Sequence, residues 1–206
     1  MFKNYIVTAM RNLLRHKVYS LINIGGLALG LAAAILILLF VRDEFSWDRW
    51  VPNAEHIFRV ELKSYPVGRE EIHLAASFTP MAPFYAQSFR EVERVTRLRY
   101  EARTVKHQGQ YFAEEPAFVD PNFLDVFQLD MLEGSREQAL LDPASAAISR
   151  SLARKYFGVE PAVGQTLTFN NGNSYRVAAV FEDIPAGSHF SLDIILPLNY
   201  AEFPER

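Results

Sequence analysis

Three aspartates at even spacing are the first side chains in this sequence that could do chemistry. Asp120, Asp125 and Asp130 follow one another closely, and grouped carboxylates can act as general acids and bases or bind a metal ion. Asp120, however, directly precedes Pro121 and a short predicted helix, where its side chain can accept a hydrogen bond from a free backbone amide as an N-cap. We interpret Asp125 and Asp130 as solvent-facing. The three aspartates therefore predict a helix start and no catalytic or metal site.

Histidine is the second candidate for chemistry. The five histidines are His16, His56, His73, His107 and His189. No two are three or four residues apart, the spacing that places two metal ligands on one face of a helix. We interpret His189, in the sequence AGSHFS, as a polar loop residue. The sequence therefore predicts no metal and no cofactor.

Motifs of the common catalytic sites do not occur in the chain. The sequence contains neither of the phosphate-binding patterns GxxxxGK[ST] and GxGxxG, and no GxSxG nucleophile elbow. The chain has no cysteine, which removes a cysteine nucleophile. A serine and a histidine could still meet in space. We predict that the protein is not an enzyme and has no catalytic residue, and an anchored extracytoplasmic enzyme is our third hypothesis.

The long uncharged run from Val18 to Val41 is the strongest signal among the elements. Its 24 residues would form a helix about 36 Å long, which crosses a hydrocarbon core of about 30 Å with some tilt. A cleaved signal peptide would end its apolar region at small residues. Here Ala32, Ala33 and Ala34 are followed by the apolar sequence ILILLFV, so we predict an uncleaved transmembrane helix over residues 18–41.

The charges beside this run predict its direction. Lys3, Arg11, Arg15 and Lys17 precede it, and no acidic residue occurs before Asp43. The positive-inside rule places such a segment in the cytoplasm. We therefore predict a bacterial inner-membrane protein with a cytoplasmic N-terminus, a single span, and its main domain in the periplasm.

Two features near the span suggest contacts with lipid. Residues 1–17 have apolar side chains at helical spacing, which predicts an amphipathic basic helix on the cytoplasmic membrane surface; the alternative is an unstructured basic tail. Trp47 and Trp50, just beyond the span, suit the aromatic belt at the opposite interface. Their alternative is ordinary packing in a protein core.

A row of small residues lies within the span. Gly26 and Gly30 form a GxxxG motif, and Ala34 continues the row. Small side chains allow two helices to approach closely in lipid. The row predicts a helix-packing face, although such motifs are also common in membrane spans by chance.

The outer region, residues 42–206, reads as a folded domain. It holds all 24 acidic residues and 17 of the 21 Lys and Arg, a net charge of −7, which does not favour nucleic-acid binding. Without disulfides it requires a hydrophobic core, which its length allows. Its patterns intermix strands and helices, so we predict an α+β fold.

The local patterns of this region predict particular elements. Alternating residues predict strands over 56–65 and 92–106, and arginines on one face of the second could bind an anionic partner or simply be solvated. A helix is predicted to begin at Thr79-Pro80. The clearest signals lie later in the chain: a buried strand at 145–148, a helix capped by Ser149 or Ser151 and ended by Gly158, a hairpin with its turn at Asn171-Gly172, and a last strand at 192–196.

Several segments together resemble a known family. Residues 2–50 look like the first membrane segment of MacB/FtsX-type ABC transporter permeases, and the outer region is similar to the MacB-like periplasmic core domain. The segments that carry the second resemblance are FVDPNFLDVFQLDMLEG, AAISRSLARKYFG, AVGQTLTFNNGNSYRVAAVFEDIP and LPL. The resemblance implies a mixed α/β domain of the MacB periplasmic core type after the single transmembrane helix.

The resemblance also implies partners and a mechanism. Such permeases form homodimers or pairs with a second permease, and they work with a cytoplasmic ABC-type ATPase that hydrolyses the ATP. They carry at least three further spans, one loop of which contacts the ATPase. Since no second apolar run precedes Arg206, we expect the N-terminal portion of a longer permease or a truncated relative. The alternative is a single-span periplasmic binding or sensing module that regulates a protein partner.

Overall fold

The computed structural model describes residues 2–158 and 161–199, without the side chain of Phe2. The expectation about Arg206 lies outside these residues. The chain divides into two compact units, Met1–Trp47 and Asp48–Arg206, which we describe in turn.

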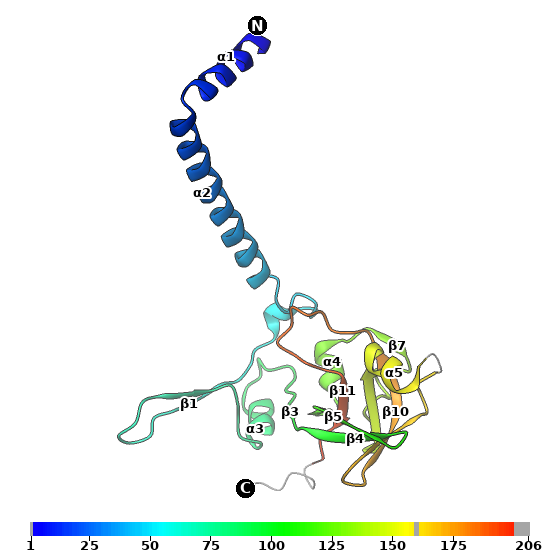
Figure 1. The fold of residues 1–206 in the computed structure, drawn as a ribbon. Coiled ribbons are helices and arrows are strands. Elements are labelled where there is room, and N and C mark those ends of the chain that lie inside the picture. The colour runs from blue at the N-terminus through cyan, green and yellow to red at the C-terminus, as the bar shows by residue number, and fades with distance from the viewer. Residues whose placement is uncertain (1, 159–160, 200–206) are drawn as a thin grey trace. The chain divides into compact units, whose positions relative to one another are not determined.

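The first unit consists of two helices joined at a bend. Helix α1 spans Phe2–Arg15, and helix α2 spans Lys17–Glu44 (Figure 1). Between them, His16 has φ −112° and ψ 52°, which is outside the helical region. Among the described residues, α2 is the one helix long and apolar enough to cross a membrane. It extends a few residues beyond both ends of the predicted span.

The second unit is built on a large mixed sheet. Its strands lie in the order β3-β6-β11-β8-β10-β9-β4-β5, and β7 also pairs with β10. The pairs β8·β10 and β6·β11 are parallel, and the other pairs are antiparallel. The strands span Leu98–Tyr100 (β3), Arg103–His107 (β4), Gln110–Glu114 (β5), Ala117–Val119 (β6), Met131–Glu133 (β7), Ser145–Ser149 (β8), Thr166–Phe169 (β9), Ser174–Phe181 (β10) and Ile194–Pro197 (β11).

The sheet curls back on itself. Strands β3 and β4 are joined by only Glu101 and Ala102, yet they lie at opposite ends of the strand order, with five strands between them. A two-residue connection can join these strands only if the two ends of the sheet approach each other. The curl places the central strands β6, β8, β10 and β11 in the interior.

Both faces of the sheet are covered, which explains why β6, β8 and β11 are buried along their whole length and β10 over its last three residues. Helix α4, Phe123–Phe127, packs its Phe123, Leu124 and Phe127 on one face. Helix α5, Arg150–Phe157, packs Leu152 and Tyr156 on the other face. Successive residues of one strand contribute to the two cores in turn, as the period of two requires.

The part of this unit from residue 52 to residue 100 has almost no hydrophobic core. It contains the 3₁₀ helix Ala54–His56, the two-stranded sheet of β1 (Leu62–Ser64) with β2 (Ile72–Leu74), and helix α3, Met81–Ser88. Every residue from 52 to 100 is at least partly exposed. Large apolar side chains are among the exposed ones, including Phe58, Val67 and Phe78.

The structure confirms the locally encoded elements. Ser149 caps α5, since its Oγ accepts a hydrogen bond from the Leu152 amide at 3.2 Å. Gly158 follows this helix with φ 70°. The hairpin of β9 and β10, the buried strand β8, helix α3 and the mixed α/β class of the domain also match the prediction.

The two long strands predicted from alternation alone are wrong in length. Only residues 62–64 of the stretch 56–65 form a strand, because β2 is the one described partner and pairs at just three positions. The stretch 92–106 is divided into β3 and β4, which pair with different neighbours. Alternation shows that a strand is allowed, but a partner strand decides where it forms.

Candidate functional site

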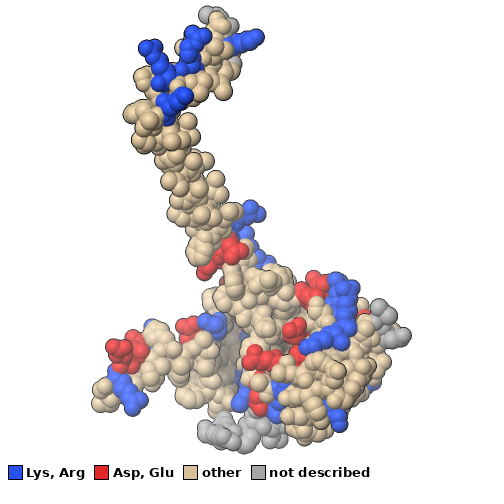
Figure 2. Space-filling view, viewed as in Figure 1, with Lys and Arg blue, Asp and Glu red and all other residues tan. Residues whose placement is uncertain are grey.

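The basic residues predicted to set the topology gather at one end of the first unit. Lys3, Arg11 and Arg15 lie on α1, and Lys17 is the first residue of α2. Figure 2 shows blue side chains over this end with no red ones beside them. Their role in orientation stays a prediction.

The small residues of α2 lie on an open surface. A Cβ atom built on Gly26 or Gly30 would meet nothing within 4 Å outside the helix's own backbone, and none of the α2 residues is buried. Gly26, Gly30 and Ala34 are therefore available for a second helix, as predicted, but no contact within the described chain tests this.

The two tryptophans have different surroundings. Trp47 belongs to the first unit and has an exposed fraction of 38%. Trp50 belongs to the second unit and packs against its core, with its ring 6.4 Å from that of Phe190 in an edge-to-face arrangement. The position of Trp50 favours the core-packing alternative, and a role in a membrane interface stays a prediction for both residues.

Asp48, the first residue of the second unit, is held by a loop far along the sequence. Its Oδ1 accepts hydrogen bonds from Ser188 Oγ and the His189 amide, both at 3.0 Å. Its Oδ2 lies 2.6 Å from His189 Nδ1, and its own amide donates to the Gly187 carbonyl at 2.9 Å. We call Asp48, Ser188 and His189 the Asp48 clamp.

Backbone and aromatic contacts support the clamp. Asp48 has φ 54°, a left-handed conformation that is sparsely populated for residues other than glycine and is retained where surrounding contacts fix it. Behind the clamp, Phe190 packs on Phe127 with ring centroids 4.8 Å apart, and Phe127 packs on Phe123 at 4.5 Å. The clamp is therefore continuous with the core under α4.

The clamp unites the residue types of a catalytic triad in a different arrangement. In a triad, the serine bonds to the histidine and the histidine bonds to the aspartate. Here both Ser188 and His189 bond to the same carboxylate. This geometry orders a loop and does not activate the Ser188 hydroxyl.

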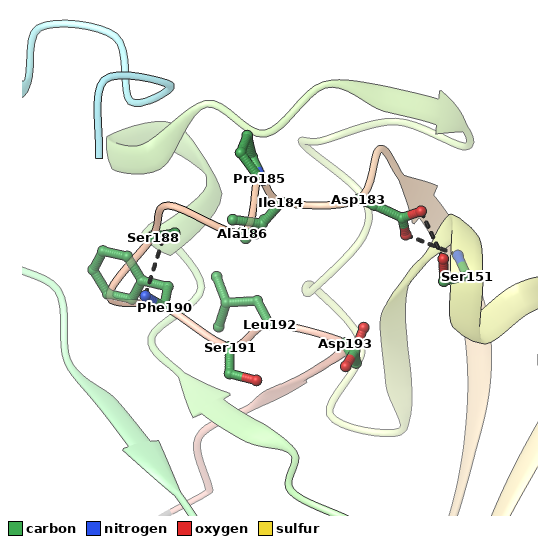
Figure 3. Close-up of a pocket in the computed structure, with 10 residues that line it drawn as sticks. All are labelled: Ser151, Asp183, Ile184, Pro185, Ala186, Ser188, Phe190, Ser191, Leu192 and Asp193. Atoms are coloured by element: carbon green, nitrogen blue, oxygen red, sulfur yellow. Dashed lines mark hydrogen bonds between the residues drawn. The ribbon is translucent and has the colours of Figure 1, made fainter. Parts of the chain in front are cut away.

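The clamped loop also forms one wall of a cleft. Residues 182–193 connect β10 to β11, two central strands of the sheet, and the cleft they enclose has a volume of about 420 Å³. Figure 3 shows Asp183 and Ser151 at one end and Ser188 and Phe190 at the other. The lining residues are Ser151, Asp183, Ile184, Pro185, Ala186, Ser188, Phe190, Ser191, Leu192 and Asp193.

The two ends of this loop are fixed to the N-terminus of α5. Asp183 accepts hydrogen bonds from the Ser151 amide at 2.8 Å and the Ser151 hydroxyl at 2.7 Å, and Asp193 accepts one from the Ser149 hydroxyl at 2.8 Å. Carboxylates are favourable at a helix N-terminus because free amides and the helix dipole point there. The loop is thus held at three places, twice by α5 and once by Asp48.

The electrostatics of the two anchoring aspartates favour their charged forms. Burial alone would raise the pKa of Asp183, but the hydrogen bonds from Ser151 and the nearby Arg150 and Arg154 outweigh it and leave the pKa below its ordinary value. The pKa of Asp48 is lowered in the same way, since hydrogen bonds from His189 and Ser188 outweigh burial. The cleft therefore has a mixed lining, with negative charge at the end formed by Asp183 and Asp193 and apolar side chains such as Phe190 and Leu192 farther along it.

The predicted capping role of Asp120 is wrong, and the arginines of the stretch 92–106 pair with carboxylates. Asp120 does not cap a helix with its side chain, because its carboxylate binds Arg97 through Nε and Nη2, both at 2.8 Å. Arg103 pairs with Glu101 at 2.9 Å. Arg99, on the same predicted face, lies 3.6 Å from the same Glu101 carboxylate. These arginines thus have carboxylate partners within the domain, and binding of an anionic partner stays an untested alternative. Within residues 2–158 and 161–199, no group of three His, Asp or Glu side chains could hold a metal ion.

Sequence reasoning missed the Asp48 clamp. Asp48 looked like one charge in a mixed flank, and His189 like an isolated loop residue. Their separation of 141 positions leaves no local pattern. The sequence offered one weak indication of the contact: Asp48 and His189 are polar residues beside apolar segments, one at the start of the domain and one near its end.

The fold and site define a class of protein: a folded domain with a surface cleft, joined in sequence to a helix of membrane-spanning length. Comparison with known families makes this specific, because the profile of the MacB-like periplasmic core domain matches residues 20–206. The chain therefore belongs to the MacB-like periplasmic core domain family, and it is a membrane protein with an extracytoplasmic domain. This is a family of permease periplasmic domains and not of enzymes.

Three solved structures are similar to this chain. A domain of a candidate permease protein from Porphyromonas gingivalis is 27% identical with a TM-score of 0.57, over 64% of this chain and 56% of the solved one. This chain thus spans little more than half of that domain. The periplasmic region of MacB from Actinobacillus actinomycetemcomitans is 19% identical with a TM-score of 0.44, over 56% and 51% of the two chains. The extracellular domain of the noncanonic ABC-type transporter YknZ from Gram-positive bacteria is 18% identical with a TM-score of 0.49, over 62% and 66%. A comparison with curated proteins gave no match.

Proposed function

We propose that this chain is the N-terminal portion of an ABC transporter permease subunit of the MacB/FtsX type. In this proposal, α2 is the first span, the N-terminus is cytoplasmic, and the domain that begins at Asp48 is periplasmic in the bacterial inner membrane. A partner ATPase hydrolyses the ATP through parts of the permease outside this sequence, and the permease acts as a homodimer or a pair. The domain transmits the resulting movement or engages cargo and periplasmic partners.

The observation that carries the proposal is the connection from Asp48 into the sheet. Asp48 follows α2 by only a few residues, and the clamp ties it to the loop between β10 and β11. A displacement of Asp48 would reach two central strands through hydrogen bonds and the Trp50–Phe190–Phe127 ring contacts. This is the connection that a domain moved by a membrane helix requires.

The proposed orientation can be tested by cysteine labelling, because the chain has no cysteine of its own. Gly68→Cys, at the exposed tip of the β1–β2 hairpin, should react with a membrane-impermeant maleimide in cells whose outer membrane alone is permeabilised. The matched variant Asn4→Cys on α1 should react only after the inner membrane is opened. Labelling of Asn4→Cys in intact inner membranes would reject the cytoplasmic N-terminus.

The partnership can be tested in the source genome and by purification. We expect a reading frame that continues into at least three further spans beside an ATPase frame, and an ATPase that co-purifies with its product. A stop codon directly after Arg206 with no neighbouring ATPase would reject the permease proposal.

The cleft favours one second candidate. A volume of about 420 Å³ with an apolar wall and an acidic end fits the side chains of a protein partner, which is what a single-span binding or sensing module would need. Under that alternative, Leu192→Ala or Asp183→Asn would weaken binding of the protein partner. No ATPase would co-purify with the wild type or with either variant.

A further inference from the structure

Helix α1 has two chemically different faces, and the described residues bury neither of them. At about 100° per residue, Ile6, Met10 and Leu13 lie on one face, and Arg11 and Arg15 lie on the opposite one. The apolar three have exposed fractions of 52%, 63% and 46%. A surface helix of a globular protein would bury such a face. The apolar face of α1 therefore needs a covering that lies outside the described chain.

The bend between α1 and α2 is held by a specific contact. His16 leaves the helical conformation, and the Ser20 hydroxyl donates a hydrogen bond to the Leu13 carbonyl at 3.2 Å across the bend. This contact satisfies a carbonyl that the interrupted helix would otherwise leave without a partner. Figure 1 shows α1 turned away from the axis of α2. If α2 crosses the membrane, α1 is directed along the surface instead of continuing through it.

The charges of α1 select the kind of surface. Lys3, Arg11, Arg15 and Lys17 have no acidic residue among or near them before Asp43, and Figure 2 shows this end covered by positive side chains. A helix that combines an apolar face with an uncompensated cationic one is attracted to a bilayer with anionic headgroups.

We propose that α1 lies in the plane of the membrane, with Ile6, Met10 and Leu13 inserted among the acyl chains and Arg11 and Arg15 bound to anionic phospholipid headgroups. The proposal rests on the proposed function, because it requires α2 to be a membrane span. A bilayer fits better than a protein partner because α2 already delivers α1 to its surface. The interaction would fix the position of the first span in the leaflet that holds the N-terminus.

The test uses the full chain in phosphatidylcholine vesicles, with and without phosphatidylglycerol. A single cysteine is introduced at Met10 on the apolar face or at Thr8 on the polar side and is labelled with an environment-sensitive fluorophore. We expect the Met10 label to become shielded from an aqueous quencher as the phosphatidylglycerol fraction rises, and the Thr8 label to stay accessible. The shielding should weaken in high salt because the attraction is electrostatic.

Substitution of the basic residues measures how strongly each positive charge contributes to membrane binding of α1. Loss of one charge near an anionic surface corresponds to about a fivefold change in binding, so Arg11→Gln or Arg15→Gln should lower the ratio of shielded to accessible Met10 label by about fivefold at a fixed phosphatidylglycerol fraction and should raise the fraction needed for half-maximal shielding. Arg42→Gln, at the other end of α2, is the matched control and should leave both quantities unchanged.

Two results would overturn the proposal. Equal shielding of Met10 with and without phosphatidylglycerol would show apolar adsorption without headgroup binding. An accessible Met10 in every lipid would show that α1 stays in water and does not insert its apolar face into the bilayer. A label at Leu31 tests separately whether α2 spans the membrane, because this label must be shielded by lipid whenever α2 is inserted. If the Leu31 label is shielded and either of the two results above is found, the proposal for α1 fails and the proposed function does not.

Discussion

Asp48 accepts three hydrogen bonds from residues that lie 140 or more positions later in the chain. Long-range hydrogen bonds of a single residue, and not a sequence motif, hold the start of the domain in place. Arg97 and Asp120 form a second such pair, with two bonds of 2.8 Å. Both aspartates hold segments of the fold in place, and neither arrangement resembles a reaction centre.

The Asp48 clamp gives a stability prediction with a defined pH range. Asp48→Asn keeps the shape of the side chain but removes its charge, and should lower the free energy of unfolding by about 1.5–3 kcal/mol at neutral pH, the size of a hydrogen bond to a charged group. Urea unfolding of the detergent-solubilised chain, followed by tryptophan fluorescence, measures this. Asp125→Asn, on an exposed residue of α4, should have little effect.

The pH dependence follows from the lowered pKa of Asp48. Its ordinary value is 3.8, so the stability from the folded carboxylate is fully present above about pH 5, where the unfolded carboxyl is ionised too, and is lost as the pH falls through the lowered pKa. The difference in unfolding midpoint between the wild type and Asp48→Asn should therefore stay constant down to about pH 5 and close in more acidic solution. A difference that grows on acidification would contradict this account of the clamp.

At the scale of elements, strand β10 organises the domain. It pairs with β8 along one edge, and with β9 and then β7 along the other. The approach of β7 is close because Gly134 follows it with φ 78°. A Cβ atom at Gly134 would collide with the Ala178 carbonyl oxygen and lie 2.9 Å from Ala179 Cα. Glycine is required here for both its conformation and its size.

Substitution of two glycines separates conformation from size. Gly164→Ala should cost about 1 kcal/mol, because Gly164 has φ 92° but open space around it. Gly134→Ala should cost about 3 kcal/mol, since overpacking adds to the same conformational cost. The same urea titration measures both, and equal costs would mean that β7 can move away from β10 freely.

The small-residue face of α2 leads to a prediction about helix association. Gly30→Leu should weaken self-association of the chain in membranes, because the added side chain keeps two helices apart. Gly25→Leu is the matched control, since Gly25 lies about 140° around the helix from Gly30. Energy transfer between labelled copies in vesicles measures association. An equal loss in both variants would point to a general effect of leucine.

At the scale of the whole molecule, the domain has a well-packed part and a sparsely packed part. The sheet carries two cores that share its central strands, whereas no residue from 52 to 100 is buried. A two-stranded sheet and a helix of eight residues are each marginal without apolar cover. This sparsely packed part is where we expect the domain to open first.

Hydrogen exchange should show this difference directly. We expect the amides of β1, β2 and α3 to exchange about a hundredfold or more faster than those of β8, β10 and β11, because local opening exposes few buried contacts. Mass spectrometry of the full chain in detergent measures both regions in one sample. Comparable protection of the two regions would show that a second copy covers residues 52–100.

The sequence by itself determined the features that depend on near neighbours. The apolar run became α2, the serine and glycine that flank α5 began and ended it, and Asn171-Gly172 turned the hairpin of β9 and β10. The family resemblance rested on the same local segments. These predictions succeeded because helix length, caps and tight turns are set by residues within a few positions of one another.

Only the tertiary structure decided which distant groups meet. Alternation at 56–65 suggested a long strand, but a partner pairs with three of its residues. Asp120 suited a helix cap, but Arg97 bound its carboxylate. The Asp48 clamp joined two residues with no pattern between them. Contacts of this kind depend on how the sheet curls and which strands pair, and that is determined by burial over the whole chain and not by the residues beside each partner.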